Sequence, residues 1–251
     1  GESATLPFDE HIDVVKETVA MASGAIPVIA GSGANSTAEA IFLTEQLGAV
    51  GVDGFLSVVP YYNKPQQAGM VAHFNAIANA SDLPVILYNV PGRTVADMLP
   101  ETVAELATHK NIVGLKDATG DIARLKQTQP LVPEDFVLLS GDDGSSCEFM
   151  CEGGHGVISV TANIAPKMCS DMQKFSKSED KDEQKKAEEI DKILQPVHKS
   201  LFIESNPSPV KYAAKLIGLC DDNVRLPLVT VLEPTKTEVK KALLSANLIN
   251  E

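Results

Sequence analysis

Short apolar segments alternate with helical patterns along most of this chain, and that alternation restricts the fold more than any other feature. Each apolar segment is five or six residues long and nearly continuous. Strands that are apolar throughout are typical of parallel sheets covered by helices on both faces. The six predicted strands are residues 26–30, 54–59, 84–88, 111–116, 136–140 and 156–160. The predicted helices between and around them are residues 9–22, 38–47, 67–79, 100–108, 121–129, 144–152 and 166–175.

The texture changes near residue 180, where a charged stretch (179–183, EDKDE) precedes a sequence that is helical with Pro and Gly interruptions. We therefore predict two parts, a strand–helix portion over residues 1–180 and a carboxy-terminal helical domain over 181–251. Six strands are two fewer than a closed eight-stranded (β/α) barrel requires. The segment Gly31-Ser32-Gly33 lacks the third glycine of a dinucleotide-binding fingerprint. It therefore indicates a tight turn and not a phosphate-binding loop.

Composition excludes several classes of function. The 251 residues carry a formal net charge of −13 without a basic stripe, which argues against nucleic acid and anionic membrane surfaces. We expect a cytoplasmic protein, because no apolar run reaches membrane-spanning length and the first residues do not resemble a secretion signal. The four cysteines lack metal-ligand spacing, so we interpret them as reduced core thiols and expect no metal; they are Cys147, Cys151, Cys169 and Cys220.

Two neighbouring strands end in reactive side chains, Tyr88 and Lys116. The carboxyl ends of parallel strands are where reactive groups gather in such folds. Apolar neighbours disfavour an ammonium ion and lower the lysine pKa, and the neutral amine can condense with a keto group to a Schiff base. A nearby phenol could transfer the protons of that dehydration. The residues alone leave open a lysine that reaches out to solvent and a tyrosine at an amphipathic rim.

The sequences around these two residues resemble signature segments of the pyruvate-dependent class I aldolases, and within them the dihydrodipicolinate synthase family. The two segments are 88–94 (YNVPGRT) and 114–120 (GLKDATG). Further similar segments run from the first residues nearly to the last: 1–6 (GESATL), 60–63 (PYYN), 139–143 (LSGDD), 153–163 (GGHGVISVTAN) and 206–211 (NPSPVK). The resemblance implies a TIM (β/α)8 barrel with a carboxy-terminal helical region.

The resemblance also implies a reaction. Lys116 would form a Schiff base with pyruvate, Tyr88 would donate and accept protons, and the enamine would attack L-aspartate 4-semialdehyde in lysine (diaminopimelate) biosynthesis. Tyr62 would cross a subunit interface to complete a neighbour's proton relay. Substrate binding is assigned to Arg93, Ile158 and Gly141. The planar, forked guanidinium of Arg93 suits a carboxylate. Without the resemblance, a surface arginine in a turn stays the alternative interpretation. No metal or organic cofactor is expected, because the lysine supplies the electron sink.

The resemblance further implies an allosteric site for L-lysine in a homotetramer built as a dimer of dimers. Its positions here are Ser3, Ala4, His11, Asn35, Glu39 and Tyr61. Phe8 stands where lysine-sensitive members often carry histidine, so we predict weakened but present inhibition.

Family chains begin with two further strands, so we expect that this chain lacks the first two strands of its barrel and shows little or no turnover alone. Two alternatives stay open. One is another lyase of the superfamily, similar to N-acetylneuraminate lyase or a keto-deoxy-sugar-acid aldolase. The other is a non-catalytic scaffold that keeps the motifs, and trapping of a pyruvate adduct at Lys116 would separate it from either enzyme.

Overall fold

The computed structural model describes residues 2–250, so Gly1, the first residue of the 1–6 segment, lies outside them. The described residues form two compact units, one made of Leu6–Gly141 and the other of residues 2–5 together with 142–250. We call them the sheet unit and the helical unit. The predicted division at residue 180 falls inside the helical unit, between two helices that pack on each other, α8 (Pro166–Ser176) and α9 (Lys181–Ser200). Residues 1–180 and 181–251 as separate domains stay a prediction.

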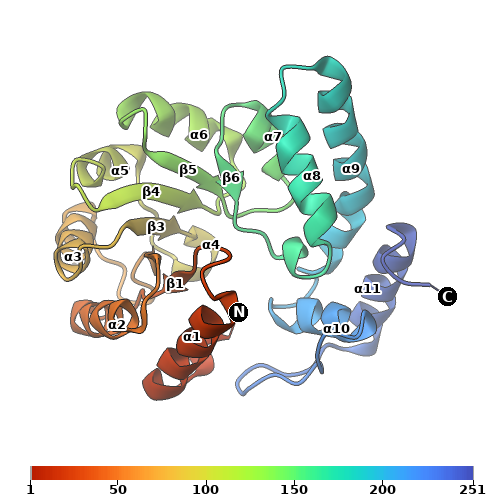
Figure 1. Cartoon of the computed structure of the whole chain (residues 1–251), viewed down its shortest axis with the longest axis horizontal. Helices are drawn as coiled ribbons and strands as arrows, with labels where there is room; N and C mark the ends of the chain where they lie inside the picture. The colour runs from red at the N-terminus through yellow and green to blue at the C-terminus, as the bar shows by residue number, and fades with distance from the viewer. Residues whose placement is uncertain (1, 251) are drawn as a thin grey trace. The chain divides into compact units, whose positions relative to one another are not determined.

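The sheet unit contains five parallel strands, paired in the order in which they occur in the chain. They are β1 (Ile29–Gly31), β2 (Gly54–Val58), β3 (Val85–Asn89), β4 (Ile112–Asp117) and β5 (Val137–Ser140). Helices cover the outside of this sheet (Figure 1); they are α1 (Phe8–Ala22), α2 (Thr37–Val50), α3 (Gln67–Asn79), α5 (Pro100–Leu106) and α6 (Ile122–Thr128). The predicted α/β class and these five strands are therefore confirmed.

Local sequence explains why these helices begin and end where they do. Ser36 precedes α2, and its hydroxyl accepts a hydrogen bond from the amide of Glu39 at 3.4 Å. Gly51 ends the same helix in the left-handed conformation, with φ of 95°. Asp121 caps α6 through a 2.9 Å bond from the Ala123 amide. A short helix that the sequence did not predict, α4 (Pro91–Thr94), follows β3 directly.

The core of the sheet unit is built from the apolar residues that the strands and helices share. Phe55 in β2, Phe74 in α3, Leu87 in β3 and Leu106 in α5 are all fully buried. Burial of side chains of this size is the main favourable contribution to folding. The rigid sheet that results fixes the carboxyl ends of β3, β4 and β5 side by side.

The sheet unit also contains the short η2 (Gln129–Leu131). The helical unit contains η1 (Ser3–Thr5), α7 (Ser146–Cys151), β6 (Gly156–Val157), η3 (Thr161–Asn163), α8, α9, α10 (Ser208–Leu216) and α11 (Glu233–Ser245). Leu194 and Met172 join α9 to α8, and Val197 and Leu243 join α9 to α11 in two apolar clusters. The amino-terminal segment is tied to this unit because Glu2 accepts a 2.8 Å bond from Lys211 Nζ and a 2.9 Å bond from the Arg225 amide.

The sixth strand is shorter than predicted. The sequence predicted a strand over residues 156–160, and β6 covers Gly156–Val157 only. The cause is Asp143, a buried residue whose carboxylate accepts bonds from the amides of Val160 and Thr161 at 2.8 and 3.0 Å. Those amides are therefore directed to a side chain, and the chain turns into η3. No helix among residues 2–250 is long and apolar enough to cross a bilayer.

Candidate active site

Tyr88 and Lys116 are neighbours across the β3–β4 pair. They are Cα partners in the parallel register, as are Asn89 and Asp117 one position later. Side chains alternate between the two faces of a strand. Tyr88 and Lys116 therefore share one face of the sheet, and Asn89 and Asp117 share the other.

The amine of Lys116 lies over the aromatic ring of Tyr88. The Nζ atom is 4.1 Å from the ring centroid, and Lys116 as a whole is only 9% exposed. A lysine that reached out to solvent would show neither feature. The structure thus brings together the two reactive residues that the sequence predicted, with the lysine out of bulk water.

The electrostatics of Tyr88 suit a proton donor that also takes a proton back. Burial raises the pKa of its phenol, because the phenolate loses hydration, and the positive charge of Arg93 partly opposes that rise. Arg93 lies in α4, five residues past Tyr88, and is exposed. It is therefore near enough to act on Tyr88 while its side chain remains accessible to a ligand.

Gly141 gives the lysine side chain its room. It follows β5, and its amide donates a 2.7 Å bond to the carbonyl of Asp117. A Cβ atom at position 141 would lie 2.8 Å from Lys116 Cε and 2.7 Å from Ala118 Cβ. Neither approach is tolerated, so any larger residue would displace Lys116 or the strand end. The structure thus places Gly141 against the side chain of Lys116.

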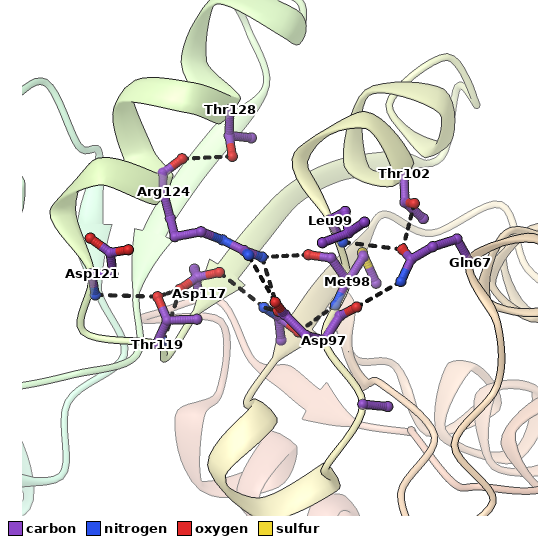
Figure 2. A network of polar contacts seen from close by, with 12 residues as sticks. Gln67, Asp97, Met98, Leu99, Thr102, Asp117, Thr119, Asp121, Arg124 and Thr128 are labelled. Carbon is purple, nitrogen blue, oxygen red and sulfur yellow. Dashed lines mark hydrogen bonds and ion pairs between the residues drawn. The ribbon is translucent and has the colours of Figure 1, made fainter.

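The opposite face of the same strands carries a network of polar contacts that sequence reasoning missed (Figure 2). Asn89 Nδ2 donates to Asp97 at 2.9 Å and to Asp117 at 3.1 Å. Arg124, in α6, pairs with Asp97 at 2.9 and 3.0 Å. The positions of Asn89 and Asp117 directly after Tyr88 and Lys116 were a usable signal. Asp97 and Arg124 gave none, because 27 residues separate them.

Ile158 lies in the helical unit, just after β6, and is partly buried. The segment that follows it is held by Asp143, as described above, and by Thr161, whose hydroxyl is 2.7 Å from Nδ1 of the buried His198. Burial lowers the pKa of His198, and nearby carboxylates oppose that shift. Asp143 lies in the 139–143 segment, and the sequence alone indicates no role for it. Its role here is to fix the backbone next to Ile158.

Tyr62 projects from the loop between β2 and α3. It is 88% exposed, and its backbone has a φ of 73°, in the left-handed region that tyrosine rarely adopts. Its neighbour Tyr61 is also exposed.

The residues predicted to bind L-lysine fall in both units. Within the sheet unit, Asn35 donates a 3.2 Å bond to the carbonyl of Tyr61. Glu39 is exposed in the first turn of α2. Burial lowers the pKa of His11, and a hydrogen bond with the Gly31 backbone opposes that shift. Ser3 and Ala4 form part of η1 in the helical unit.

Phe8 begins α1, and its ring lies 5.9 Å from that of Phe42 between centroids. Phe8, the residue that departs from the family pattern, therefore packs against another aromatic ring.

The described residues include no group of three or more His, Cys, Asp or Glu side chains arranged to hold a metal ion. Cys147 and Cys169 are buried, as expected of core thiols, whereas Cys151 and Cys220 are exposed and depart from that prediction.

A buried lysine over a tyrosine, at the carboxyl ends of parallel strands, is an arrangement suited to the class of Schiff-base aldolases. The sequence profile of the Dihydrodipicolinate synthetase family matches residues 1–246, and the chain belongs to this family of class I aldolase-type lyases. The resemblance seen in the sequence is thereby confirmed.

Individual relatives agree. The 4-hydroxy-tetrahydrodipicolinate synthase of Pseudoalteromonas atlantica is 62% identical over 251 residues, which cover 100% of this chain and 85% of that protein. The crystal structure of the chloride-inhibited dihydrodipicolinate synthase of Acinetobacter baumannii, complexed with pyruvate, superposes with a TM-score of 0.95 at 45% identity, covering 99% of this chain and 84% of that one. The dihydrodipicolinate synthase of Cyanidioschyzon merolae with lysine bound gives 0.94 at 38% identity, over 98% and 83%.

Proposed function

We propose that this chain catalyses the condensation of pyruvate with L-aspartate 4-semialdehyde, the reaction of a 4-hydroxy-tetrahydrodipicolinate synthase. The observation that carries the proposal is the buried Lys116 amine over the ring of Tyr88. Membership of the family supports it, as does the pyruvate bound by the Acinetobacter baumannii relative.

The proposed chemistry begins at Lys116. Its neutral Nζ attacks the keto carbon of pyruvate, and the resulting carbinolamine loses water to give an imine. Loss of a methyl proton gives an enamine, whose carbon attacks the aldehyde carbon and leaves a hydroxyl there. The amino group of the semialdehyde then attacks the imine carbon, closes the ring and releases Lys116 as the free amine.

Tyr88 is the proposed proton carrier in these steps. Its neutral phenol protonates the departing hydroxyl of the carbinolamine and later recovers the proton. The raised pKa of Tyr88 keeps the phenol neutral at the start. Arg93 is the proposed partner for the carboxylate of the semialdehyde, since its planar fork matches a carboxylate. We assign the backbone near Ile158 to pyruvate, and Gly141 to the space that Lys116 and its adduct require.

Borohydride trapping tests the proposal. The purified protein is incubated with pyruvate and sodium borohydride, digested, and analysed by mass spectrometry. A reduced pyruvyl group on Lys116 is expected, and it should vanish in Lys116→Ala. Lys110→Ala is the matched control, because the side chain of Lys110 is 79% exposed. Trapping reports the imine step alone, so it tests Lys116 even if turnover is as low as the sequence predicted. No adduct, or an adduct at another lysine, would refute the proposal.

A condensation assay identifies the second substrate. The adduct-forming protein should consume L-aspartate 4-semialdehyde, whereas release of pyruvate from a keto-deoxy sugar acid would favour the aldolase alternative instead.

We further propose that the chain assembles as a homotetramer in the cytoplasm. The exposed, left-handed Tyr62 supports the assembly, because a bulky aromatic held in that conformation suits a residue that completes a neighbouring subunit's site. Four free cysteines suit a reducing compartment. Superposition on relatives supports a (β/α)8 arrangement. The absence of the first two strands stays a prediction; the matched residues cover 85% of the first relative's length. The proposed catalysis replaces the loss of turnover expected from the sequence, and the condensation assay decides between them.

We also propose that L-lysine binds at Asn35, Glu39, Tyr61 and His11, with Ser3 and Ala4 contributing. The lysine-bound relative supports this, and so does the bond from Asn35 to Tyr61. Phe8 offers an aromatic ring and no hydrogen-bond donor, so inhibition should be weak. Activity that is unchanged at millimolar lysine would remove the idea.

A further inference from the structure

The segment that carries Arg93 is a loop closed at its base by one side chain. The chain leaves β3 at Asn89, forms α4, and returns at Met98. Asn89 is fully buried. Its Oδ1 accepts a 3.0 Å bond from the Met98 amide, and its Nδ2 donates a 2.9 Å bond to Asp97 Oδ1. Both ends of the loop are thereby joined through a single amide group.

Arg124 holds the returning end of the loop from outside. Its two terminal nitrogens donate to the two oxygens of Asp97 at 2.9 and 3.0 Å, and one of them also donates to the Met98 carbonyl at 2.5 Å (Figure 2). The Arg124 side chain is only 15% exposed. A bidentate pair of this kind fixes both distance and orientation, which a lysine cannot do.

The same network reaches the strand that bears the reactive lysine. Asn89 Nδ2 also donates to Asp117 Oδ2 at 3.1 Å, and Asp117 directly follows Lys116. The amide of Thr119 in turn donates to Asp117 Oδ1 at 2.9 Å. The base of the Arg93 loop and the end of β4 are therefore fixed to each other on the face of the sheet opposite to Lys116.

The loop is held in a conformation that its own sequence disfavours. Val95 has a φ of 61°, although β-branched residues are genuine outliers in that region. Val95 is 66% exposed, so its side chain gains little from packing. Strained backbone of this type persists only where surrounding contacts over-determine it. Next to Val95, its own amide donates to the Pro91 carbonyl at 2.9 Å, and the Thr94 hydroxyl donates to the Ala96 carbonyl at 2.8 Å. The returning end is fixed by the bonds of Asn89 and Arg124 to Asp97 and Met98, and by a 2.8 Å bond from Gln67 Nε2 to the Asp97 carbonyl.

We propose that Asp97 and Arg124 are positioning residues. Their ion pair holds the strained loop so that Arg93 is presented to the carboxylate of the aldehyde substrate. The inference rests on the proposed function, because it assigns Arg93 to that substrate. It also separates the two substrates: loss of the pair should weaken use of the aldehyde while Lys116 continues to react with pyruvate.

The experiment compares Arg124→Met, which keeps much of the side-chain length, with Arg124→Lys, which keeps the charge without the fork. Arg124→Met should raise KM for the aldehyde about ten- to hundredfold, the size of effect expected from a small misplacement of a binding group. The rate of borohydride trapping with pyruvate should stay at the parental value. The aldehyde KM of Arg124→Lys should lie between those of the parent and Arg124→Met. Lys167→Met, which breaks an exposed ion pair with Asp171, is the matched control.

Two further measurements make the test independent of turnover and specific to strain. Trypsin cleavage after Arg93 should be faster in Arg124→Met, because the loop opens more often. Val95→Asn, which tolerates the left-handed conformation, should restore part of the aldehyde KM and slow that cleavage when added to Arg124→Met. A merely structural role for Arg124 would show no such rescue.

The possible outcomes are distinct. An unchanged KM with an unchanged cleavage rate in Arg124→Met would overturn the inference. So would a loss of pyruvate trapping in parallel with the rise in KM. If the parent protein forms no adduct at Lys116, the proposed function fails, and the cleavage rates still decide whether Arg124 holds the loop.

Discussion

The two faces of the β3–β4 pair divide the work of the site. One face presents Tyr88 and Lys116, with the amine over the ring. The other presents Asn89 and Asp117, which are bonded to each other and to Asp97 in the polar network. We therefore propose different roles for residues one position apart in the same strands. The reacting groups need a dry, electrostatically tuned setting, whereas the groups behind them need firm hydrogen bonds.

The largest effect is expected from Tyr88→Phe, which changes the face that carries Lys116. Removal of the phenol hydroxyl removes the proposed proton carrier, so kcat should fall about 10²- to 10⁴-fold, while the aldehyde KM changes little. Arg124→Met should show the reverse pattern. Steady-state kinetics of both variants check this, and a Tyr88→Phe enzyme with parental kcat would end the assignment of Tyr88.

Gly141→Ala should have the next largest effect. The new methyl group would meet Lys116 Cε at 2.8 Å, so the lysine or the strand end must move. Overpacking of this kind costs about 1–3 kcal/mol in the free energy of unfolding, and the rate of pyruvate trapping should fall as well.

Gly48→Ala is the control for that variant. A Cβ at position 48 makes only ordinary contacts, the nearest 3.5 Å from Phe55, and alanine favours the helix. Denaturant unfolding and trapping rates should separate the two variants. Equal behaviour would show that space beside Lys116 is not what position 141 provides.

The smallest effect is expected from the titration of His73 in α3. It should change the stability of the fold and leave the site unaffected. Burial lowers its pKa from the usual 6.5 to about 4, and its Nδ1 is 2.9 Å from the Thr37 hydroxyl. Between these two pKa values, the His73 imidazole is therefore protonated in the unfolded chain and neutral in the folded chain. Stability is full above pH 6.5 and falls by about 3 kcal/mol as the pH drops to 4.

His73→Gln cannot titrate and should flatten this part of the profile, whereas Thr37→Val should keep the slope. Chemical denaturation at a series of pH values measures both. A parental slope in His73→Gln would assign the acid sensitivity to other groups.

Much of the fold followed from the sequence because its signals are local. Apolar runs predicted five strands to within one or two residues at most boundaries, and the predicted helix 38–47 lies inside α2, three residues short of its end. The strand predicted over residues 156–160 was too long, because the amides of Val160 and Thr161 donate to the Asp143 carboxylate. That carboxylate lies 17 and 18 residues away in the chain, so no local signal indicates it. α4 was missed because four residues around a Pro-Gly pair carry no helical period.

By itself the sequence determined the order of strands and helices, the family, and the pairing of a tyrosine with a lysine at adjacent strand ends. Those properties depend on periodicity and on residue identity, which are written along the chain. Only the tertiary structure decided that the amine lies over the phenol ring, that position 141 borders it too closely for a Cβ atom, and that Arg124 pairs with Asp97 at the end of the Arg93 loop. These facts depend on distances between residues far apart in the chain, and packing sets those distances.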